Sequence, residues 1–370
     1  MKKLVVLAAL AAVGASSYAQ SSVTIFGVVD ATVQYGKGSA GNKTGLGNGG
    51  NASSRLGFRG TEDLGGGLSA GFWLEAGMNN DDGTGKNNNF GGGNNTNNQF
   101  GSVPSVSDGL KFARRSTVSL TSSAFGEVRL GRDYSTQYLN ISAFDPFGDV
   151  GVGATMLDND RIGLGGPVTV RVSNAVSWIS PNFSGFYGQL QAYRGENAVA
   201  TAATATAPAI GKDDGNGFGG RIGYLNGPIS VALATSSTKY LAVGNIATTN
   251  IAGSYDFGVV KVMAMYDQDK VKAPTNAKGK AFLVGASMPL GQSEIKASFS
   301  SYKRDTLGTD PRADKIAVGY VYNLSKRTAV YTTYAHVNNK NGSNVALNGG
   351  SLSNPNDNAN GLDIGLRHSF

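Results

Sequence analysis

Apolar and polar residues alternate along most of the chain, and almost no stretch from Val23 to the C-terminus repeats with the helical period. Between Ile25 and Gln34, for example, Val29 and Val33 share one face while Asp30 and Thr32 share the other. Alternation of this kind is typical of β-strands with one apolar and one polar face. The pattern therefore predicts an all-β chain.

The clearest alternation runs from Val168 to Trp178. Strict period two puts four valines and the tryptophan of this segment on one face, and an arginine and three hydroxyl residues on the other. We expect Val168, Val170, Val172, Val176 and Trp178 to face one way, and Thr169, Arg171, Ser173 and Ser177 the other.

Short turns and long polar links separate the predicted strands in strict alternation. The short turns are 62–67, 122–126, 181–184, 226–228, 256–258, 289–293 and 323–327. The long links are 36–51, 79–109, 133–167, 195–215, 239–247, 268–279, 304–312 and 339–359.

These turns and links join sixteen strands, with every short turn at one end of the sheet and every long link at the other. That asymmetry is typical of outer-membrane barrels, and closure leaves no unpaired backbone in lipid. We predict a 16-stranded antiparallel transmembrane β-barrel. A secreted β-sandwich or propeller is the soluble alternative.

The first nineteen residues have the organisation of a signal peptide. Met1–Lys3 is cationic, Leu4–Val13 is apolar but too short to span a bilayer, and Ser17–Ala19 offers a cleavage site. A first core helix is the alternative interpretation. We predict a cleaved signal peptide at 1–19, a barrel domain at 20–370, and a location in the cell outer membrane.

Composition narrows the chemistry that this chain can perform. It has no cysteine and two histidines, His336 and His368, so Cys-ligated metals, thiol nucleophiles and His clusters are excluded or improbable. It also lacks a Gly-x-Ser-x-Gly motif. The formal charge of +7 is scattered rather than gathered into the basic stripe of a nucleic-acid-binding protein. We expect no enzymatic activity, no metal or cofactor, and no nucleic-acid partner.

A barrel of this size has a water-filled lumen, so charges on its inner face act on passing ions. Alternation with apolar residues assigns that face. It places Arg55, Arg115, Arg171 and Glu75 inward, with Arg114 at a loop rim. Further candidates for lumen charges are Asp30, Arg59, Arg129 and Arg132. The alternative is that they are ordinary solvated positions of a barrel.

The link 133–167 is too apolar for an exposed loop, with residues such as Tyr138, Phe144 and Phe147. We expect this third loop to fold into the lumen as the constriction loop. Its acids, Asp145, Asp149, Asp158 and Asp160, would then oppose the arginines. The Asn- and Gly-rich stretch 79–101 instead predicts a flexible external loop.

The last strand ends on an aromatic residue. Leu362, Ile364, Leu366, His368 and Phe370 alternate with polar or small residues. The terminal Phe370 resembles the signal that the barrel assembly machinery recognises, although an ordinary amphipathic strand has the same pattern.

Six segments resemble the general porins of beta-proteobacterial outer membranes. They are Ser22–Asp30 (SVTIFGVVD), Ser54–Gly77, Arg114–Arg132, Ile179–Phe186 (ISPNFSGF), Gly319–Thr328 and Gly365–Phe370. The chain departs from the family pattern in its long stretch 79–109, around Arg171 and in the third loop.

The resemblance implies a homotrimer with a third loop in the lumen and passive diffusion of small hydrophilic solutes and ions. The family's constriction arginines map onto Arg55, Arg114, Arg115 and Arg171, and its acid onto Glu75. Several members prefer anions, which agrees with the net positive lumen. Outer-membrane lipids, including lipopolysaccharide, and the barrel assembly machinery are the other expected partners.

Two other functions remain open from the sequence. One is an adhesion or structural barrel whose long loops bind a partner. The other is an outer-membrane hydrolase, which would depend on His336.

Overall fold

The computed structural model describes residues 22–86, 109–157, 170–204, 209–272, 276–305, 309–347 and 351–370. The predicted signal peptide at 1–19 lies outside these residues. So do most of the Asn- and Gly-rich stretch (87–101) and the end of the predicted third loop (158–167), including Asp158 and Asp160.

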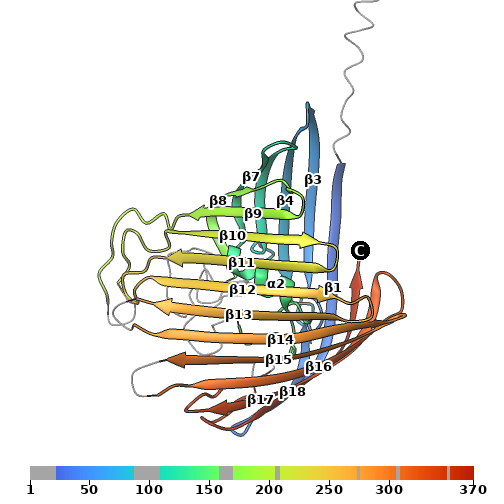
Figure 1. Cartoon of the computed structure of the whole chain (residues 1–370). Helices are drawn as coiled ribbons and strands as arrows, with labels where there is room; N and C mark the ends of the chain where they lie inside the picture. The colour runs from blue at the N-terminus through green and yellow to red at the C-terminus, as the bar shows by residue number, and fades with distance from the viewer. Residues whose placement is uncertain are drawn as a thin grey trace, which may run out of the picture.

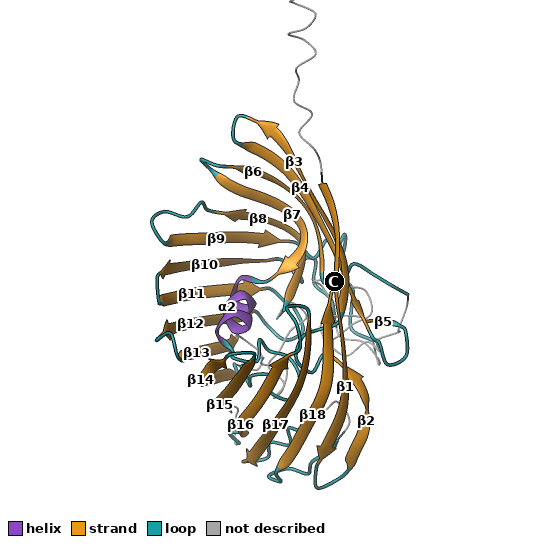
Figure 2. Ribbon diagram, turned by 90° about the vertical axis from the view of Figure 1, so that its right-hand side faces the viewer, coloured by secondary structure: helices purple, strands orange, loops and turns teal. Residues whose placement is uncertain are grey.

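In the described part of the chain, eighteen β-strands form one antiparallel sheet that wraps around a central space (Figures 1 and 2). Their bounds are β1 (Ser22–Lys37), β2 (Asn42–Asn48), β3 (Arg55–Gly65), β4 (Leu68–Met78), β5 (Gly85–Lys86), β6 (Arg115–Ser122), β7 (Gly126–Tyr134), β8 (Arg171–Ile179), β9 (Phe186–Tyr193), β10 (Gly217–Asn226), β11 (Ile229–Thr238), β12 (Ile246–Asp256), β13 (Lys261–Val271), β14 (Lys278–Leu290), β15 (Ser293–Asp305), β16 (Arg312–Asn323), β17 (Thr328–Lys340) and β18 (Ala359–Ser369).

These strands occupy sixteen positions around the barrel. β2 and β3 both pair with β1, and β5 and β6 both pair with β4, so each couple fills one position. β18 pairs with β1 and closes the ring. The predicted 16-stranded antiparallel barrel is confirmed.

The ends of the strands differ as the sequence predicts. Turns such as 66–67, 227–228 and 291–292 join strands at one end, and links such as 135–170 and 194–216 join them at the other. The link predicted at 36–51 is wrong in part, because β1 runs to Lys37 and returns as β2 in register with it. Glycines mask the alternation there, while the backbone pairs regardless of side chains.

The apolar face of most strands points outward. Ile25, Val33, Val118 and Leu120 are exposed, whereas Asp30 and Thr32 on the opposite face of β1 are buried. Exposed apolar side chains on the outside of a closed barrel form the surface that meets lipid.

The face predicted for residues 168–178 is wrong at Val170 and Val172. Val176 is 54% exposed, but Val172 is fully buried. β7 pairs Gly131 with Ala175 and Asp133 with Val172, so β8 carries one extra residue at that point. Asn174, with a φ of 54°, lies in this β-bulge, which shifts the alternation by one residue.

One helix, α2 (Thr136–Phe144), interrupts the third long link and lies inside the ring of strands (Figure 2). It contacts the inner side of β9 to β13. The sequence did not predict it, because its polar Gln137 and Asn140 are buried together with Ile141 and Phe144, which removes any amphipathic period. Among the described residues, no helix is long and apolar enough to cross a membrane.

The main hydrophobic core therefore lies within the barrel, between the third loop and one wall. Phe144, Phe147 and Met156 of the loop join Leu283 and Val337 of the wall in one buried cluster. Glycines make room for the loop: a Cβ atom at Gly285 would meet Pro146, and one at Gly319 would meet Phe147.

Hydrogen bonds fix the loop to the same wall. The Val152 N–H donates to Asp363 Oδ2 at 2.9 Å, and the Met156 N–H donates to Ser300 Oγ at 3.1 Å. The Lys315 ammonium donates to the Ala154 carbonyl. The described part of the loop thus leans on β14 to β18.

Candidate functional site

Arginines gather on the inner face of the wall that lies opposite the described part of the third loop. β3, β6, β7 and β8 supply them, and Glu75 of β4 lies at their centre. Strand register brings the group together, because Glu75 pairs with Gly57 of β3 and with Arg115 of β6. Residues far apart in the sequence therefore meet on one patch of sheet.

Glu75 holds two of the predicted arginines. Its Oε1 accepts from Arg114 Nε at 2.5 Å and lies 3.7 Å from Arg55 Nη1. The Trp73 indole N–H donates to its Oε2 at 3.1 Å. The carboxylate thereby orients Arg55 toward the lumen while Arg114 stays behind it.

Arg171 packs behind the same group, against aromatic rings. Its Nε donates to the Arg114 carbonyl at 2.7 Å, and its guanidinium lies 4.5 Å from the centre of the Tyr134 ring. Tyr134 in turn stacks at 5.0 Å on Tyr138 of α2. Arg171 thus links the arginine wall to the base of the third loop.

A second group extends along β6 and β7. Arg115 lies 4.5 Å from the Trp73 ring centre and 3.5 Å from Asp133 Oδ2. Arg129 contacts the same Asp133 oxygen at 2.6 Å and Glu127 at 2.8 Å.

Arg59 of β3 completes the wall. Its guanidinium lies 5.1 Å from the ring centre of Trp73 and 5.3 Å from that of Phe26. Both rings hold its charge in place without neutralising it.

The arginines differ in their access to water. Arg59 is exposed and the Arg55 side chain is 29% exposed, whereas Arg114 is only 5% exposed. Arg59, Trp73, Arg115 and Arg129 line a cavity of about 410 Å³ on this wall. Among the described residues, this group combines six arginines with three carboxylates and therefore carries net positive charge: Arg55, Arg59, Arg114, Arg115, Arg129 and Arg171 against Glu75, Glu127 and Asp133.

Two further lumen candidates, Arg132 of β7 and Asp30 of β1, are buried. Arg132 is buried and donates to the Ala113 carbonyl at 2.6 Å and to Ser173 Oγ at 2.7 Å. It therefore ties together the loop ends of β6 and β8. Asp30 is also buried; it accepts backbone N–H groups from Asn51 and Ala52 and the hydroxyl of Tyr331.

The loop acids do not form a row opposite the arginines in the described residues. Asp145 accepts the backbone N–H groups of Phe147, Asp149 and Thr155 and so shapes the turn after α2. Burial raises the pKa of Asp145, against the effect of those donors and of Lys315. Asp149 lies in the same turn, with a φ of 57°.

Five side chains that the sequence reasoning missed belong to this machinery. Glu127 and Trp73 alternate with outward-facing residues of their strands, so the period-two pattern alone could have identified them as inward-facing. Arg221 donates to Asn140 Oδ1 of α2 at 2.7 Å, and Lys315 also contacts the loop. Asp133 was placed in the loop, whereas it lies in β7 beside Arg115 and Arg129.

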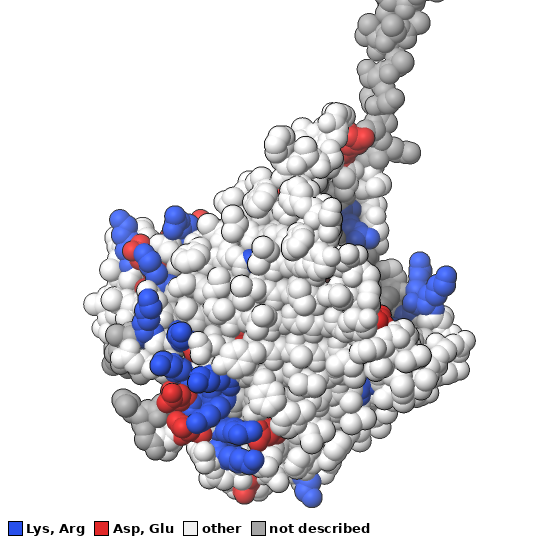
Figure 3. Space-filling view, in the orientation of Figure 1, with Lys and Arg blue, Asp and Glu red and all other residues white. Residues whose placement is uncertain are grey.

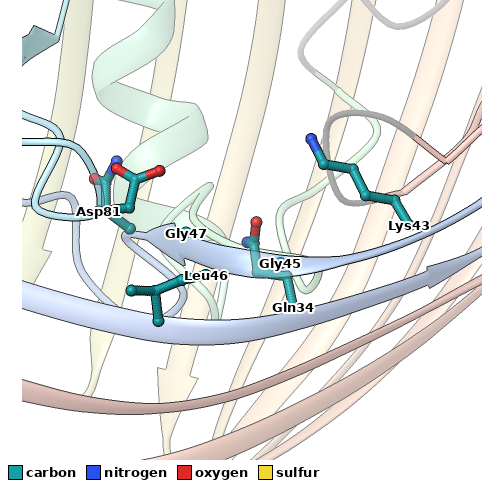
Figure 4. A pocket seen from close by; sticks show the side chains of 7 residues that line it. Gln34, Lys43, Gly45, Leu46, Gly47 and Asp81 are labelled. Carbon is teal, nitrogen blue, oxygen red and sulfur yellow. The ribbon is translucent and has the colours of Figure 1, made fainter.

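A second, smaller cavity of about 200 Å³ lies on the β1–β2 hairpin (Figure 4). Gln34, Lys43, Gly45 and Asp81 line it. Its single lysine and single aspartate give it no dominant charge, and we assign it no role.

The C-terminal strand completes the barrel as predicted. The Phe370 N–H donates to the Gly27 carbonyl at 3.1 Å, and the Gly27 N–H donates back at 3.0 Å. Ile364, Leu366 and Phe370 are exposed on the outer surface, and Asp363 points the other way and is buried.

A closed sixteen-position barrel with an apolar exterior and a charged, water-filled interior defines an outer-membrane channel. Residues 6–342 match the family model described as Gram-negative porin. The chain belongs to this family. It is a channel protein of the outer membrane through which small hydrophilic solutes pass, and not an enzyme.

Individual relatives agree with this assignment. The chain is 39% identical to outer membrane porin protein 32 of Delftia acidovorans, over 100% of this chain and 99% of that protein. It is 29% identical to an outer membrane porin protein of Bordetella pertussis, over 92% and 95% of the two chains. Among solved structures, an anion-selective porin from Comamonas acidovorans matches with a TM-score of 0.80 and 35% identity, covering 95% of this chain and 100% of that one.

Proposed function

We propose that this porin conducts small hydrophilic anions in preference to cations. The observation that carries the proposal is the excess of arginines over carboxylates on the wall formed by β3, β4, β6, β7 and β8. The anion selectivity named for the Comamonas acidovorans porin, which is similar to this chain, supports it.

The arginines act at different distances from the water of the lumen. Arg59, Arg115 and Arg55 offer guanidinium groups to an anion that has lost part of its hydration shell, and a narrow lumen screens them less than bulk water does. Arg114 and Arg171 position the exposed groups from behind. Glu75 prevents repulsion among the arginines from opening the wall.

The third loop, residues 133–167, forms the constriction in this proposal. The apolar side chains of its described part pack on β11 to β17 and narrow the lumen from that side. Anions are thereby forced past the positive wall.

The active unit is a homotrimer surrounded by outer-membrane lipids, including lipopolysaccharide, after insertion by the barrel assembly machinery through Phe370. The outward residues Val33, Tyr35 and Leu46 of the β1–β2 hairpin are exposed and give a neighbouring protomer an apolar surface.

Single-channel recording in a planar bilayer with a KCl gradient tests the proposal. We expect conductance in groups of three equal steps and a reversal potential that favours chloride. A potential that favours potassium would contradict the charge assignment. Silence from protein that migrates as a folded barrel would contradict the channel itself.

A matched pair of variants locates the filter. Arg59→Gln with Arg115→Gln should move the reversal potential toward potassium. Lys212→Gln with Lys239→Gln removes the same charge from outer loops and should leave the potential unchanged. Equal shifts in both variants would show that overall charge, and not the wall, sets the preference.

A further inference from the structure

The cavity of about 410 Å³ on the arginine wall lies toward the short turns of the barrel. Its lining residues on β3 and β4 flank the turn 66–67, and those on β6 and β7 flank the turn 123–125. Short turns of outer-membrane barrels face the periplasm. The lining does not include Arg55, Arg114 or Arg171, so the cavity lies beside the group that Glu75 holds and is a separate place for a solute.

One side of this cavity offers positive charge that the chain neutralises only in part. Both carboxylate oxygens of Glu127 accept from Arg129, at 2.9 and 2.8 Å, and Asp133 pairs with Arg129 as well. Arg115 lies 3.5 Å from Asp133 Oδ2. In the described parts of the chain, no carboxylate lies within ion-pair distance of Arg59, which is exposed. An anion at Arg59 therefore gains a charge-assisted hydrogen bond without breaking an ion pair.

Trp73 holds two of the guanidinium groups in place. The Arg59 and Arg115 groups lie 5.1 and 4.5 Å from its ring centre. The ring itself is fixed by the indole N–H bond to Glu75 and by an edge contact with Phe26 at 5.0 Å. Side chains that are ordered before a solute arrives lose less conformational entropy when they bind it. The cavity is thus prepared for an anion.

Hydroxyl groups line the rest of the cavity. They belong to Thr61, Ser69, Thr117, Ser119 and Thr121, on three neighbouring strands. The register of β4 and β6 places Ser69 opposite Thr121, and Gly71 opposite Ser119, so Gly71 adds no side chain between the hydroxyls. A hydroxyl group both donates and accepts hydrogen bonds. This lining suits a solute that carries several hydroxyl groups of its own.

Charged side chains in this half of the barrel are directed into the lumen. Figure 3 shows Lys and Arg gathered at the left of the visible outer surface, over the strand ends with the long links. Between there and the short turns of β10 to β13, the same surface has hardly any charged side chain. The cavity, in contrast, gathers three arginines on an inner face. A solute must therefore enter the lumen to reach them.

We propose that this cavity binds a phosphorylated sugar. Its phosphate, with a charge of about −1.5 to −2 at pH 7, binds Arg59 and Arg115, and its hydroxyl groups bind the Ser and Thr hydroxyls and Glu127. An aromatic anion fits less well, because the Trp73 ring is already in contact with two guanidinium groups and Phe26. The inference rests on the proposed function and names a class of solute for the same wall.

Trp73 fluorescence of the purified porin in detergent tests the site. The chain has two tryptophans, and Trp178 is exposed on the outer surface, so the Trp178→Phe variant leaves Trp73 as the single reporter. Titration with glucose 6-phosphate should give a saturable change. Glucose and inorganic phosphate should each bind at least about tenfold more weakly, because each lacks one half of the contacts. Binding of inorganic phosphate, glucose or benzoate as tight as that of glucose 6-phosphate would overturn the proposal.

A matched pair of variants in the Trp178→Phe background locates the hydroxyl contacts. Ser69→Ala with Thr121→Val removes two opposite hydroxyls and no charge. It should weaken binding of glucose 6-phosphate about tenfold and leave inorganic phosphate unaffected. The control, Ser230→Ala with Ser254→Ala, removes another opposite pair from the inner side of β11 and β12 near the short turns and should change neither. Equal losses in both variants, or none in the first, would contradict the site. Heat-dependent migration on gels confirms that each variant is folded.

Reversal potentials in a KCl gradient separate this inference from the proposed function. The hydroxyl variant keeps every charge, so it should keep the wild-type potential. A chloride-selective channel whose Trp73 fluorescence does not respond to glucose 6-phosphate would overturn the sugar site alone. A saturable response in a channel that prefers potassium would contradict the proposed anion preference alone.

Discussion

The two halves of the barrel use the same alternation of residues for opposite purposes. On β3, β4 and β6 to β8, inward residues are charged and meet water, as Arg59 and Arg115 do. On β11 to β17, inward residues such as Ala281, Ala317 and Ala335 are small, apolar and fully covered by the third loop. An inward side chain therefore lines a channel on one wall and a protein core on the other.

The difference shows that the alternation of residues along a strand decides only which side of the sheet each side chain faces. What covers that side is decided by a segment from elsewhere in the chain. The wall of β11 to β17, here called the packed wall, holds the described part of the loop by apolar packing. The wall of β3, β4 and β6 to β8, here called the open wall, holds its arginines by ion pairs and aromatic rings. The two walls should accordingly respond to different perturbations.

The largest effect should come from breaking the packed wall. Phe144→Ala removes a buried ring of the third loop and should cost the docked loop roughly 3–5 kcal/mol. We expect a noisier and larger single-channel current and a lower midpoint of unfolding in urea. Phe125→Ala, at a turn residue that is 79% exposed, is the control and should change neither. A quiet channel in the Phe144 variant would show that the hydrogen bonds alone hold the loop.

Removing the central carboxylate of the open wall should have the next largest effect. Glu75→Gln leaves Arg55 and Arg114 close together without their shared acid, at a cost of about 1–3 kcal/mol in unfolding free energy. The same change should raise the chloride preference, because the wall gains positive charge. Glu62→Gln, at an exposed position of β3, serves as control. A fall in chloride preference on losing the Glu75 charge would contradict this account.

Single neutralisations on the open wall should separate exposed from buried arginines. Arg59→Gln should lower the chloride-to-potassium permeability ratio by up to about fivefold, since one charge near the ion contributes about 1 kcal/mol in water. Arg171→Gln, at a residue only 6% exposed, should change that ratio less and alter conductance instead. Reversal potentials and conductances of the two variants check this. Equal changes in the permeability ratio would mean that the exposure of an arginine does not determine its effect on ion selectivity.

Salt should have the smallest effect, and it should act on the open wall alone. Raising KCl from 0.1 M to 1 M shortens the screening length from about 10 Å to about 3 Å. The chloride preference should fall, while the current noise set by the packed loop stays the same. Reversal potentials at several mean concentrations measure the first quantity. A preference that is independent of salt would place the selective charges out of reach of mobile ions.

The sequence predicted the regular strands better than it predicted bulges and the third loop. Arg115 and Glu75 follow from alternation with Val118 and Leu74, because their strands are regular. Val172 was misassigned because an extra residue at Asn174 shifts the alternation, and a bulge leaves no trace in hydrophobicity. The sequence also did not show that Asp145 accepts backbone hydrogen bonds in the turn after α2, since the donor N–H groups meet only in the folded loop.

The sequence by itself determined the closed all-β barrel, its sixteen strand positions and the outward apolar surface. Period-two alternation and the lengths of turns and links are local, so they can be read without knowing which strands meet. Only the tertiary structure decided which arginines share Glu75, where α2 packs, and which wall the described part of the third loop packs against. Those outcomes depend on contacts between strands and a loop that are far apart in the chain, and no local pattern encodes such distances.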